Sequence, residues 1–325
     1  MYNIIVKKYG APDDLIYEKA DEPKLGKKDI KIDVHYAGLN FADVLTIKGK
    51  YQERPRPPFS PGLEVSGVVR ELGSLCSRFN INDNVMAIMK YGGFKDKVIV
   101  PEENTYKTPH GMSLRDAGAF PVAYGTAFSA IIDKGKIRRN ETCLILGATG
   151  GVGIAAIQIA KAFGANVIAC GGDDKKLETC ILNGADFIIN YKKSIIRTEL
   201  KKIGIKEIDL VIDMVGGQAC VDAVKVLAWN GRIIIVGFAS GSIPEIPANR
   251  LLLKNAKADG LYWGEYAYRY PKKIEEDFLV MQKLYIGKKI KPNIDREFSL
   301  KDAAKALNYL IDRKNLGKVI LKCQS

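Results

Sequence analysis

The fold is decided by residues 147–153, which read GATGGVG, together with the sequence on either side of them. Residues 142–146 form a short apolar run typical of a β-strand, and an apolar periodicity typical of a helix begins at residue 154. A glycine turn between a strand and a helix directs backbone N–H groups and the positive end of the helix dipole toward a phosphate. The spacing G-x-x-G-x-x-G is not the standard G-x-G-x-x-G, so the prediction of a dinucleotide site rests on the strand and the helix around the glycines.

The residues of this turn that we expect to lie against a dinucleotide are Gly147, Ala148, Gly150, Gly151 and Val152. The expected donors are their backbone N–H groups. The alternative is a strand-to-helix turn that binds no ligand.

The hydrophobic pattern outside this turn predicts an α/β protein of two domains. Up to residue 121, short β-like runs are separated by Gly, Pro and Asn turns, which predicts a mostly β domain. From residue 122, strands alternate with helices, residues 218–229 among them, which predicts a doubly wound parallel sheet. The last strands and helix are too few for a core of their own and are expected to return to the β domain. The predicted domains are therefore 1–121 with 286–325, and 122–285.

Composition excludes several classes of protein. A chain of 325 residues with 47% hydrophobic and 27% charged residues is typical of a globular protein of two domains. No apolar stretch approaches the roughly 20 residues that a membrane span needs. The first eight residues read as a strand and lack the features of a signal peptide, so a cytoplasmic location is expected.

The cysteines and the charge exclude further kinds of site. Six cysteines and two histidines are scattered without a C-x-x-C pair, so neither a disulfide framework nor a zinc cluster is predicted. The net charge is +13, but the lysines are spread along the chain in pairs and form no basic tract interleaved with aromatic residues. A solvated basic surface is therefore expected rather than a nucleic-acid interface.

The end of the second predicted strand of the parallel sheet indicates which nicotinamide cofactor is bound. An acidic side chain there binds the ribose 2′-hydroxyl of NADH, whereas the 2′-phosphate of NADPH needs small residues and a cation. This strand ends at Gly172 without a carboxylate, and Asp173 is expected to cap the next helix. Lys175 and Lys176 then oppose the helix dipole unless an anion is bound nearby. We therefore expect NADPH, the alternative being that both lysines are merely solvated.

Six short motifs also occur in a characteristic order and spacing. They are NFAD at 40–43, PGLEVSG at 61–67, YGTA at 124–127, GGVG at 150–153, INY at 189–191 and GFASG at 237–241. In combination they resemble the medium-chain dehydrogenases/reductases, and most of all the zinc-independent NADPH:quinone oxidoreductases, the zeta-crystallin-like branch. The resemblance covers essentially the whole chain. It implies a GroES-like β domain split around a Rossmann domain, an active site in the cleft between them, and a homodimer formed across Rossmann sheet edges.

Departures from the zinc alcohol dehydrogenases of the same superfamily predict that no metal is bound. Leu63 stands where those enzymes have a histidine, and Asn40 stands where their catalytic cysteine falls. Zinc prefers thiolate and imidazole ligands, which neither residue supplies. Glu64 is retained, and we expect its carboxylate to order a loop or to meet an arginine.

The resemblance also implies roles for individual residues. Asn40 would lie beside the nicotinamide and its ribose, and Tyr51 would line the substrate cleft, where a phenol can donate a proton. Asn40 could equally cap a turn, and Tyr51 could be a surface aromatic residue in a proline-rich loop. Leu45 replaces a tyrosine of other family members. The cofactor contacts that the resemblance implies are Thr126 and Phe238 at the nicotinamide side and Gly172, Lys176, Tyr191 and Arg313 around the 2′-phosphate.

The implied chemistry is the reduction of a small molecule, a quinone, by hydride from NADPH without a metal. One alternative is an NADPH-dependent enoyl or alkenal reductase that acts on a conjugated carbonyl. The other is a family member that binds NADPH without catalysis. No feature of the sequence decides among them.

Overall fold

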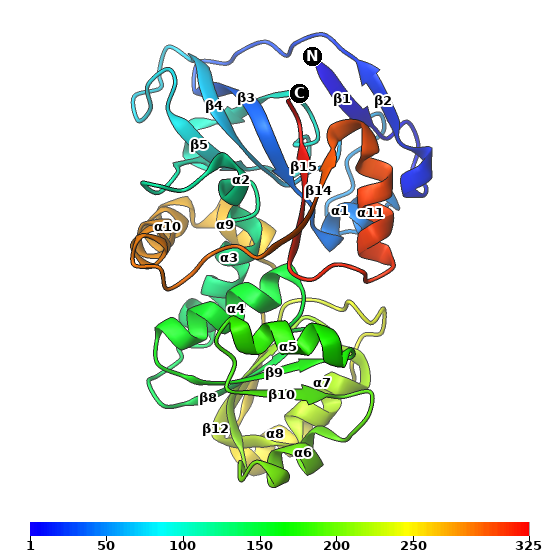
Figure 1. Cartoon of the computed structure of the whole chain (residues 1–325), viewed down its shortest axis with the longest axis vertical. Coiled ribbons are helices and arrows are strands. Elements are labelled where there is room, and N and C mark those ends of the chain that lie inside the picture. The colour runs from blue at the N-terminus through cyan, green and yellow to red at the C-terminus, as the bar shows by residue number, and fades with distance from the viewer. Residues whose placement is uncertain (325) are drawn as a thin grey trace. The chain divides into compact units, whose positions relative to one another are not determined.

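The computed structural model of the chain describes residues 1–324, which divide into two units (Figure 1). Unit 1 comprises Met1–Val122, Tyr270–Ile286 and the segment that starts at Pro292. Unit 2 comprises Ala123–Arg269 and Gly287–Lys291. Unit 1 is mostly β and unit 2 contains a parallel sheet with helices, as the sequence predicts.

Unit 1 is built on a sheet with the strand order β14-β15-β3-β4-β5-β7, in which β6 also pairs with β3. In the first part of β3 every second side chain, those of Ile30, Ile32 and Val34, is buried, because successive residues of a strand point to opposite faces. These strands are β3 (Asp29–Gly38), β4 (Glu64–Leu72), β5 (Asn84–Ile88), β6 (Lys97–Pro101), β7 (Thr105–Lys107), β14 (Ile294–Ser299) and β15 (Lys318–Lys322). The C-terminal β15 pairs antiparallel with β3, so the end of the chain completes the sheet that its beginning starts.

A separate hairpin and several helices complete unit 1. The hairpin pairs β1 (Tyr2–Ile5) with β2 (Ile16–Lys19). The helical elements are η1 (Pro12–Asp14), α1 (Phe41–Ile47), η2 (Glu102–Asn104), α2 (Leu114–Ala117), α10 (Pro271–Ile286), η4 (Leu300–Asp302) and α11 (Ala303–Ile311). Helix α11 buries Ala303, Ala306 and Leu307 in the core of this unit.

Helix α10 belongs to unit 1, whereas the predicted bounds 122–285 place all but its last residue in the second domain. Its buried face carries Ile274, Phe278 and Met281. The ring centroid of Phe278 lies 4.2 Å from that of Tyr106 and 6.4 Å from that of Phe120, and both partners belong to unit 1. Long-range aromatic packing therefore decides the assignment of this helix, and the alternation of strands and helices along the chain does not reveal it.

Unit 2 contains a parallel sheet with the strand order β10-β9-β8-β11-β12-β13. All five strand pairs are parallel, and the two central strands are buried along almost their whole length. The strands are β8 (Thr142–Leu146), β9 (Asn166–Gly171), β10 (Phe187–Asn190), β11 (Ile208–Asp213), β12 (Leu227–Ile235) and β13 (Lys257–Gly260). This confirms the predicted doubly wound sheet, in which ligands bind at the carboxyl ends of the strands.

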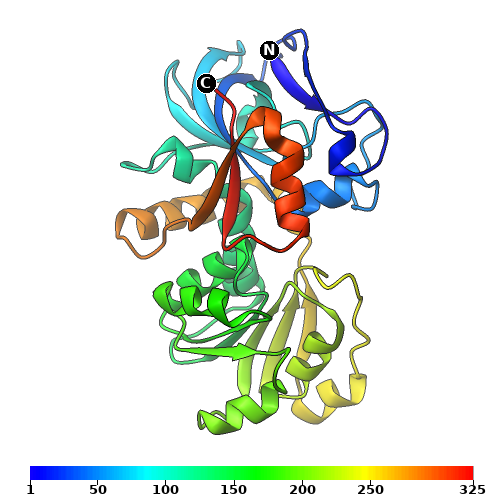
Figure 2. The same cartoon turned by 45° about the vertical axis from the view of Figure 1, so that its right-hand side comes forward.

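Helices cover both faces of this sheet, α4 and α5 on one and α6 and α7 on the other (Figure 2). The helical elements of the unit are η3 (Ser129–Lys134), α4 (Gly151–Ala162), α5 (Asp174–Leu182), α6 (Ile196–Lys202), α7 (Gly217–Val224), α8 (Ala248–Lys254) and α9 (Trp263–Arg269). Helix α3 (Pro121–Phe128) begins in unit 1 and ends in unit 2.

The prediction of a single helix over residues 218–229 is wrong at its end. Helix α7 ends at Val224, and β12 begins at Leu227. The N–H group of Ile208 donates to the carbonyl of Val226 at 2.9 Å, and Leu227 pairs with Ile208. Pairing with β11 therefore overrides the helical periodicity here.

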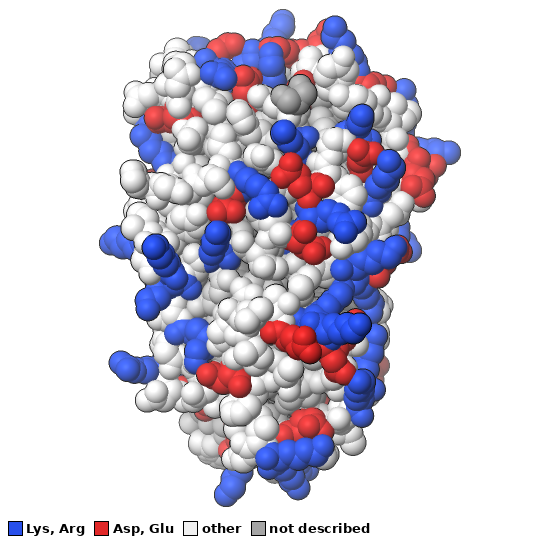
Figure 3. Space-filling model, in the orientation of Figure 1, with Lys and Arg blue, Asp and Glu red and all other residues white. Residues whose placement is uncertain are grey.

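Within residues 1–324 no helix is both long enough and apolar enough to cross a bilayer. Lys and Arg side chains are interspersed with Asp and Glu over the face shown in Figure 3. Many charged side chains form ion pairs, as Lys161 does with Asp186 at 2.9 Å.

Candidate functional site

The glycine turn of unit 2 connects β8 to α4 and depends on residues without a side chain. Gly147 has φ +80°, and a Cβ on Gly153 would lie 2.4 Å from the carbonyl oxygen of Gly147. The first N–H group of α4 to reach a helix carbonyl is that of Ile154, which donates to Gly150 at 2.9 Å. The three N–H groups before it have no carbonyl one turn back to bond. A phosphate at this end of α4 would accept hydrogen bonds from them.

The N–H groups at the start of the turn are bonded within the protein. Those of Gly147 and Ala148 both donate to the carbonyl of Cys170 on β9 at 3.0 Å, and that of Gly150 donates to Gly147 at 3.2 Å. Ala148 is also fully buried, whereas Gly150 and Gly151 are half-buried. Gly147 and Ala148 therefore fix the shape of the turn, and the N–H groups that remain for the predicted nucleotide contact are those at the start of α4.

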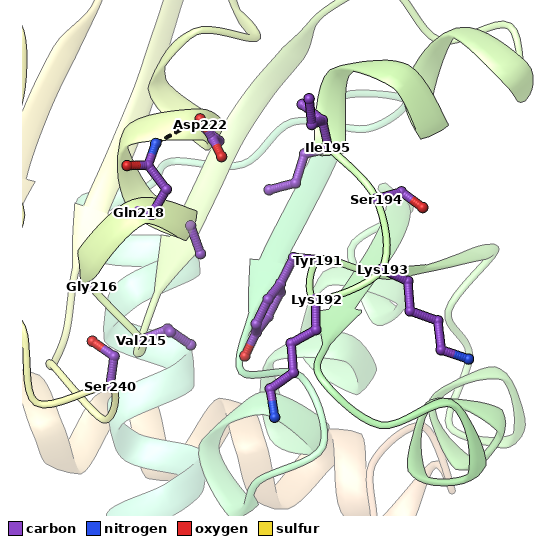
Figure 4. A pocket seen from close by; sticks show the side chains of 12 residues that line it. Tyr191, Lys192, Lys193, Ser194, Ile195, Val215, Gly216, Gln218, Asp222 and Ser240 are labelled. Carbon is purple, nitrogen blue, oxygen red and sulfur yellow. Dashed lines mark hydrogen bonds between the residues drawn. The ribbon is translucent and has the colours of Figure 1, made fainter.

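A pocket of about 440 Å³ lies at the carboxyl ends of the strands of unit 2 (Figure 4). One wall is the loop after β10, which contains Tyr191 and Lys192, and the opposite wall is the loop after β11, which contains Val215 and Gly216. In Figure 4 the ring of Tyr191 points into the pocket, facing Val215. Doubly wound sheets bind nucleotides at the carboxyl ends of their strands.

Buried Asp213, the last residue of β11, shapes the second wall. Its Oδ1 accepts the N–H groups of Val215 at 2.8 Å and Gly216 at 2.9 Å, and burial raises the pKa of Asp213. Gly216 has φ +71°, and a Cβ there would lie 2.9 Å from the ring of Phe238. Phe238, a predicted cofactor residue, therefore packs against the wall of this pocket.

The end of β9 carries the small residues that a 2′-phosphate requires. Gly171 ends the strand, and a Cβ on the following Gly172 would lie 2.7 Å from Cε of Lys192. The side chain of Asp173 caps α5, as predicted, because it accepts the N–H group of Lys176 at 3.2 Å. Gly172 and Tyr191 thus follow neighbouring strands, and Lys176 lies in the first turn of the helix between them.

Thr126 and Arg313 are among the predicted cofactor residues that do not line this pocket. Thr126 is buried on α3 in unit 2. Arg313 follows α11 in unit 1, where it is exposed and has φ +53°. The predicted contacts of both residues with a cofactor stay predictions.

Unit 1 contains a buried polar cluster, here called the Glu64 cluster, formed by Asn40, Glu64 and Lys318. The carboxylate of Glu64 accepts hydrogen bonds from Nζ of Lys318 at 2.6 Å and from Nδ2 of Asn40 at 2.8 Å. Its other oxygen accepts the N–H group of Val122 at 2.8 Å. Glu64 is fully buried and the side chain of Lys318 is 5% exposed. The cationic partner of Glu64 is therefore a lysine, and not the arginine that was one of the two expectations.

The Glu64 cluster fixes the orientation of the Asn40 amide. Lys318 donates to Oδ1 of Asn40 at 2.9 Å and to the carbonyl of Leu39 at 2.8 Å. Because Oδ1 faces a donor and Nδ2 faces an acceptor, a flipped amide would lose both bonds. Asn40 stands at the N-cap of α1, but there its backbone N–H group donates to Asp43 at 2.8 Å, while its side chain belongs to the cluster.

Asp43 lies beside this cluster and is itself buried. Its two oxygens accept the N–H groups of Asn40 and, at 3.1 Å, of Gly62. Burial raises the pKa of Asp43 to about 7, against the lowering effect of these N–H groups and of Lys318. Asp43 thus joins the start of α1 to the loop before β4.

Tyr51 lies four residues after α1 and is half-buried. Its carbonyl accepts a hydrogen bond from Nε of Arg54 at 3.3 Å. Leu45, on α1, is also half-buried. The role of Tyr51 as a proton donor stays a prediction.

Among residues 1–324 no three His, Cys, Asp or Glu side chains are grouped so that they could hold a metal ion. The six cysteines are free thiols. Burial raises the pKa of Cys143 and of Cys180 to about 12, so both are protonated at neutral pH and are poor metal ligands. The predicted absence of a metal stays a prediction.

Sequence reasoning missed two residues of these sites. Lys318 is 254 residues from its partner Glu64, so no local pattern links them. Lys192 belongs to one of the lysine pairs that are spread along the chain, and the pairs by themselves predict no site. The available signal was its position directly after Tyr191, a residue already expected at the 2′-phosphate.

Two protein-family models match the chain. The model described as an alcohol dehydrogenase GroES-like domain matches residues 26–110, and the model described as a zinc-binding dehydrogenase matches residues 151–278. The first match confirms the predicted GroES-like fold of the β part.

Relatives and solved structures match nearly the whole chain. Quinone oxidoreductase-like protein 2 of Mus musculus is 38% identical over 315 residues, which cover 94% of this chain and 88% of that protein. The quinone oxidoreductase of Thermus thermophilus, solved also as its complex with NADPH, is 30% identical with a TM-score of 0.87 and covers 99% and 100% of the two chains. The quinone oxidoreductase of Escherichia coli in complex with NADPH is 25% identical with a TM-score of 0.91 and the same coverage.

Proposed function

The chain is an oxidoreductase that belongs to the quinone oxidoreductase family of the medium-chain dehydrogenases/reductases, and from this we propose that it reduces quinones with NADPH and without a metal ion. The observation that carries the proposal is the pocket of unit 2 lined by Tyr191 and Lys192, together with the small residues at the end of β9, beside which the Lys192 side chain lies. The glycine turn that begins α4 belongs to the same unit. The names of the relatives support a quinone as the acceptor.

The residues of unit 2 fit a dinucleotide with a 2′-phosphate. The N–H groups at the start of α4 would bind the pyrophosphate, since the bare turn lets a phosphate approach the backbone. Lys176 and Tyr191 would bind the 2′-phosphate, with Arg313 as a further candidate from unit 1. NADPH, when bound, supplies the hydride. Thr126 and the backbone of Phe238 are proposed to contact the nicotinamide side.

In unit 1 we assign Asn40 to orient the reacting groups and Tyr51 to donate a proton. The Asn40 amide is suited to this because Lys318 and Glu64 hold it in one orientation. Reduction of a quinone to a hydroquinone adds a hydride and a proton, and a quinone is electron-poor enough to accept hydride without a Lewis acid. Asn40 and Leu63 replace the metal-binding residue types of the zinc enzymes, which supports the metal-free reaction.

We also propose that the protein is a cytoplasmic homodimer. In the sheet of unit 2, β13 is an edge strand, and the neighbouring α8 exposes the large apolar side chains of Leu252 and Leu253. Unpaired edges and apolar side chains of this kind favour association. Sedimentation as a monomer at micromolar concentration would contradict the dimer.

The function is tested by measuring NADPH oxidation with a panel of quinones and a panel of enones. We expect turnover with at least one quinone class and slower turnover with every enone. Faster turnover with enones would favour the enoyl or alkenal reductase. Tight NADPH binding without turnover on either panel would favour the non-catalytic alternative.

The Tyr51→Phe variant distinguishes quinone from enone chemistry, because it removes only a hydroxyl group. A quinone becomes an oxyanion that aromatisation stabilises, whereas a reduced enone must be protonated on carbon. General acids contribute about 10²–10⁴-fold to a rate. With quinones we therefore expect kcat to fall by less than about tenfold. A loss of several hundredfold with quinones would shift the assignment to the enoyl-reductase alternative.

Activity is expected to survive strong chelators. Since Asn40 and Leu63 offer neither thiolate nor imidazole, removal of metal ions should change neither turnover nor the thermal midpoint. Elemental analysis of the purified protein should show no stoichiometric zinc. Stoichiometric zinc whose removal abolishes turnover would contradict the metal-free reaction.

A further inference from the structure

We infer that Lys192 is a specificity-determining residue that selects NADPH over NADH by binding the 2′-phosphate. The inference rests on the proposed function and names a residue that neither the sequence motifs nor the family resemblance assigns. Three observations support it. The side chain of Lys192 lies beside Gly172, the acidic groups near it are bonded to other residues, and the side chain extends beside the ring of Tyr191.

The side chain of Lys192 lies across the end of β9. A Cβ on Gly172 would lie 2.7 Å from Cε, 3.1 Å from Cδ and 3.4 Å from Cγ of Lys192, so the aliphatic part of this side chain occupies the space beside Gly172. The residue after the second strand of a Rossmann sheet is where the substituent on the ribose 2′ position is recognised. The Lys192 ammonium group is therefore held near that position by a loop from the next strand.

The acidic groups near Lys192 are already engaged with other residues. Asp174 pairs with Lys193 and accepts a hydrogen bond from Asn190, and the hydrogen bond to Lys193 is the main reason that its pKa is lowered. The side chain of Asp173 caps α5. Within residues 1–324 Lys192 forms no ion pair with a carboxylate, so its charge is not neutralised in this way.

Lys193 provides a matched control at the next position. Both side chains are exposed, but in Figure 4 Lys192 extends beside the ring of Tyr191 whereas Lys193 is directed away from it. Lys193 is also paired with Asp174. Removal of either lysine changes the net charge by the same amount, so any difference between the two variants reports position and not overall charge.

The expected effect follows from one charge-assisted hydrogen bond. Lys192→Ala should raise the dissociation constant of NADPH about tenfold and leave that of NADH unchanged. Lys193→Ala should change both by less than about twofold. Lys192→Arg should retain the preference for NADPH, because a guanidinium also binds phosphate. Gly172→Ala should weaken NADPH selectively, since its methyl group displaces the Lys192 side chain.

The test is calorimetric titration of the full chain and its variants with NADPH, NADH, 2′,5′-ADP and 5′-AMP. The inference predicts that Lys192→Ala loses about tenfold in affinity for the two ligands with a 2′-phosphate and nothing for the other two. Equal losses for all four ligands, no loss for any, or the same loss in Lys193→Ala would overturn it. If the wild-type chain binds NADH and NADPH equally, this inference fails while the oxidoreductase stands. If it binds neither, the proposed function itself fails.

Discussion

Lys318→Met is expected to lower the free energy of unfolding by about 3–5 kcal/mol, because it leaves the carboxylate of Glu64 buried without its cation. Glu64 is fully buried, and Lys318 supplies the charge that opposes its own. Asn40 Nδ2 and the N–H group of Val122 would remain as donors, but neither carries a charge. Equilibrium unfolding in urea, monitored by a spectroscopic signal that reports on unit 1, measures the loss in the free energy of unfolding.

An exposed ion pair close by in the chain is the control. Lys314 pairs with Asp312 at 2.8 Å, but both side chains are more than half exposed. Lys314→Met should change the free energy of unfolding by no more than about 1 kcal/mol. The double variant Lys318→Met with Glu64→Gln should lose less than the sum of the two single losses, since it removes both charges together. A loss below about 1 kcal/mol for Lys318→Met alone would mean that water or a shifted side chain already solvates Glu64.

The Glu64 cluster contains contacts that cannot be predicted from the sequence. The motif at 61–67 indicates that Glu64 is retained where a neighbouring histidine is lost, and from this a carboxylate that orders a loop or meets an arginine is predicted. The identity of the partner is not predictable, because Lys318 reaches Glu64 through the pairing of β15 with β3, and that register depends on the whole sheet. The role of the Asn40 amide cannot be predicted from the sequence for the same reason, since an asparagine that caps a helix and one whose amide bonds to a distant side chain have the same local sequence.

In unit 2 the local sequence patterns predict more of the structure than they do in unit 1. The apolar run before Gly147 and the helical periodicity after Gly153 predict the turn, its strand and its helix, because these features depend on neighbours in the sequence. The pocket is less predictable, since its walls come from the loops after β10 and β11, which are not adjacent in the sheet. The assignment of α10 fails similarly, because its partner Tyr106 lies far away in the chain.

The second large expected effect concerns the glycine turn, where two alanine variants separate the contribution to stability from the contribution to nucleotide binding. In Gly153→Ala the new methyl group would lie 2.4 Å from the carbonyl oxygen of Gly147 and 2.6 Å from two backbone atoms of Ala148. No flexible side chain is available to move away, so α4 must shift relative to β8. We expect a loss of about 1–3 kcal/mol in the free energy of unfolding, and weaker nucleotide binding because the N–H groups of α4 shift with it.

Gly150→Ala is expected to weaken nucleotide binding as well, but without a loss of stability. Its Cβ would meet only the carbonyl oxygen of Gly147, at 3.6 Å, and its φ of −83° is open to any residue. Alanine is a poorer N-cap than glycine, but it loses less backbone entropy on folding, so stability should stay within about 0.5 kcal/mol. The methyl group would nevertheless occupy the surface that a pyrophosphate approaches, and we expect the dissociation constant of NADPH to rise at least about tenfold. Urea unfolding and calorimetric titration of both variants measure the two effects. If Gly150→Ala binds NADPH as tightly as the wild-type chain, or if Gly153→Ala unfolds at the wild-type urea concentration, the turn does not hold the pyrophosphate in the way its geometry indicates.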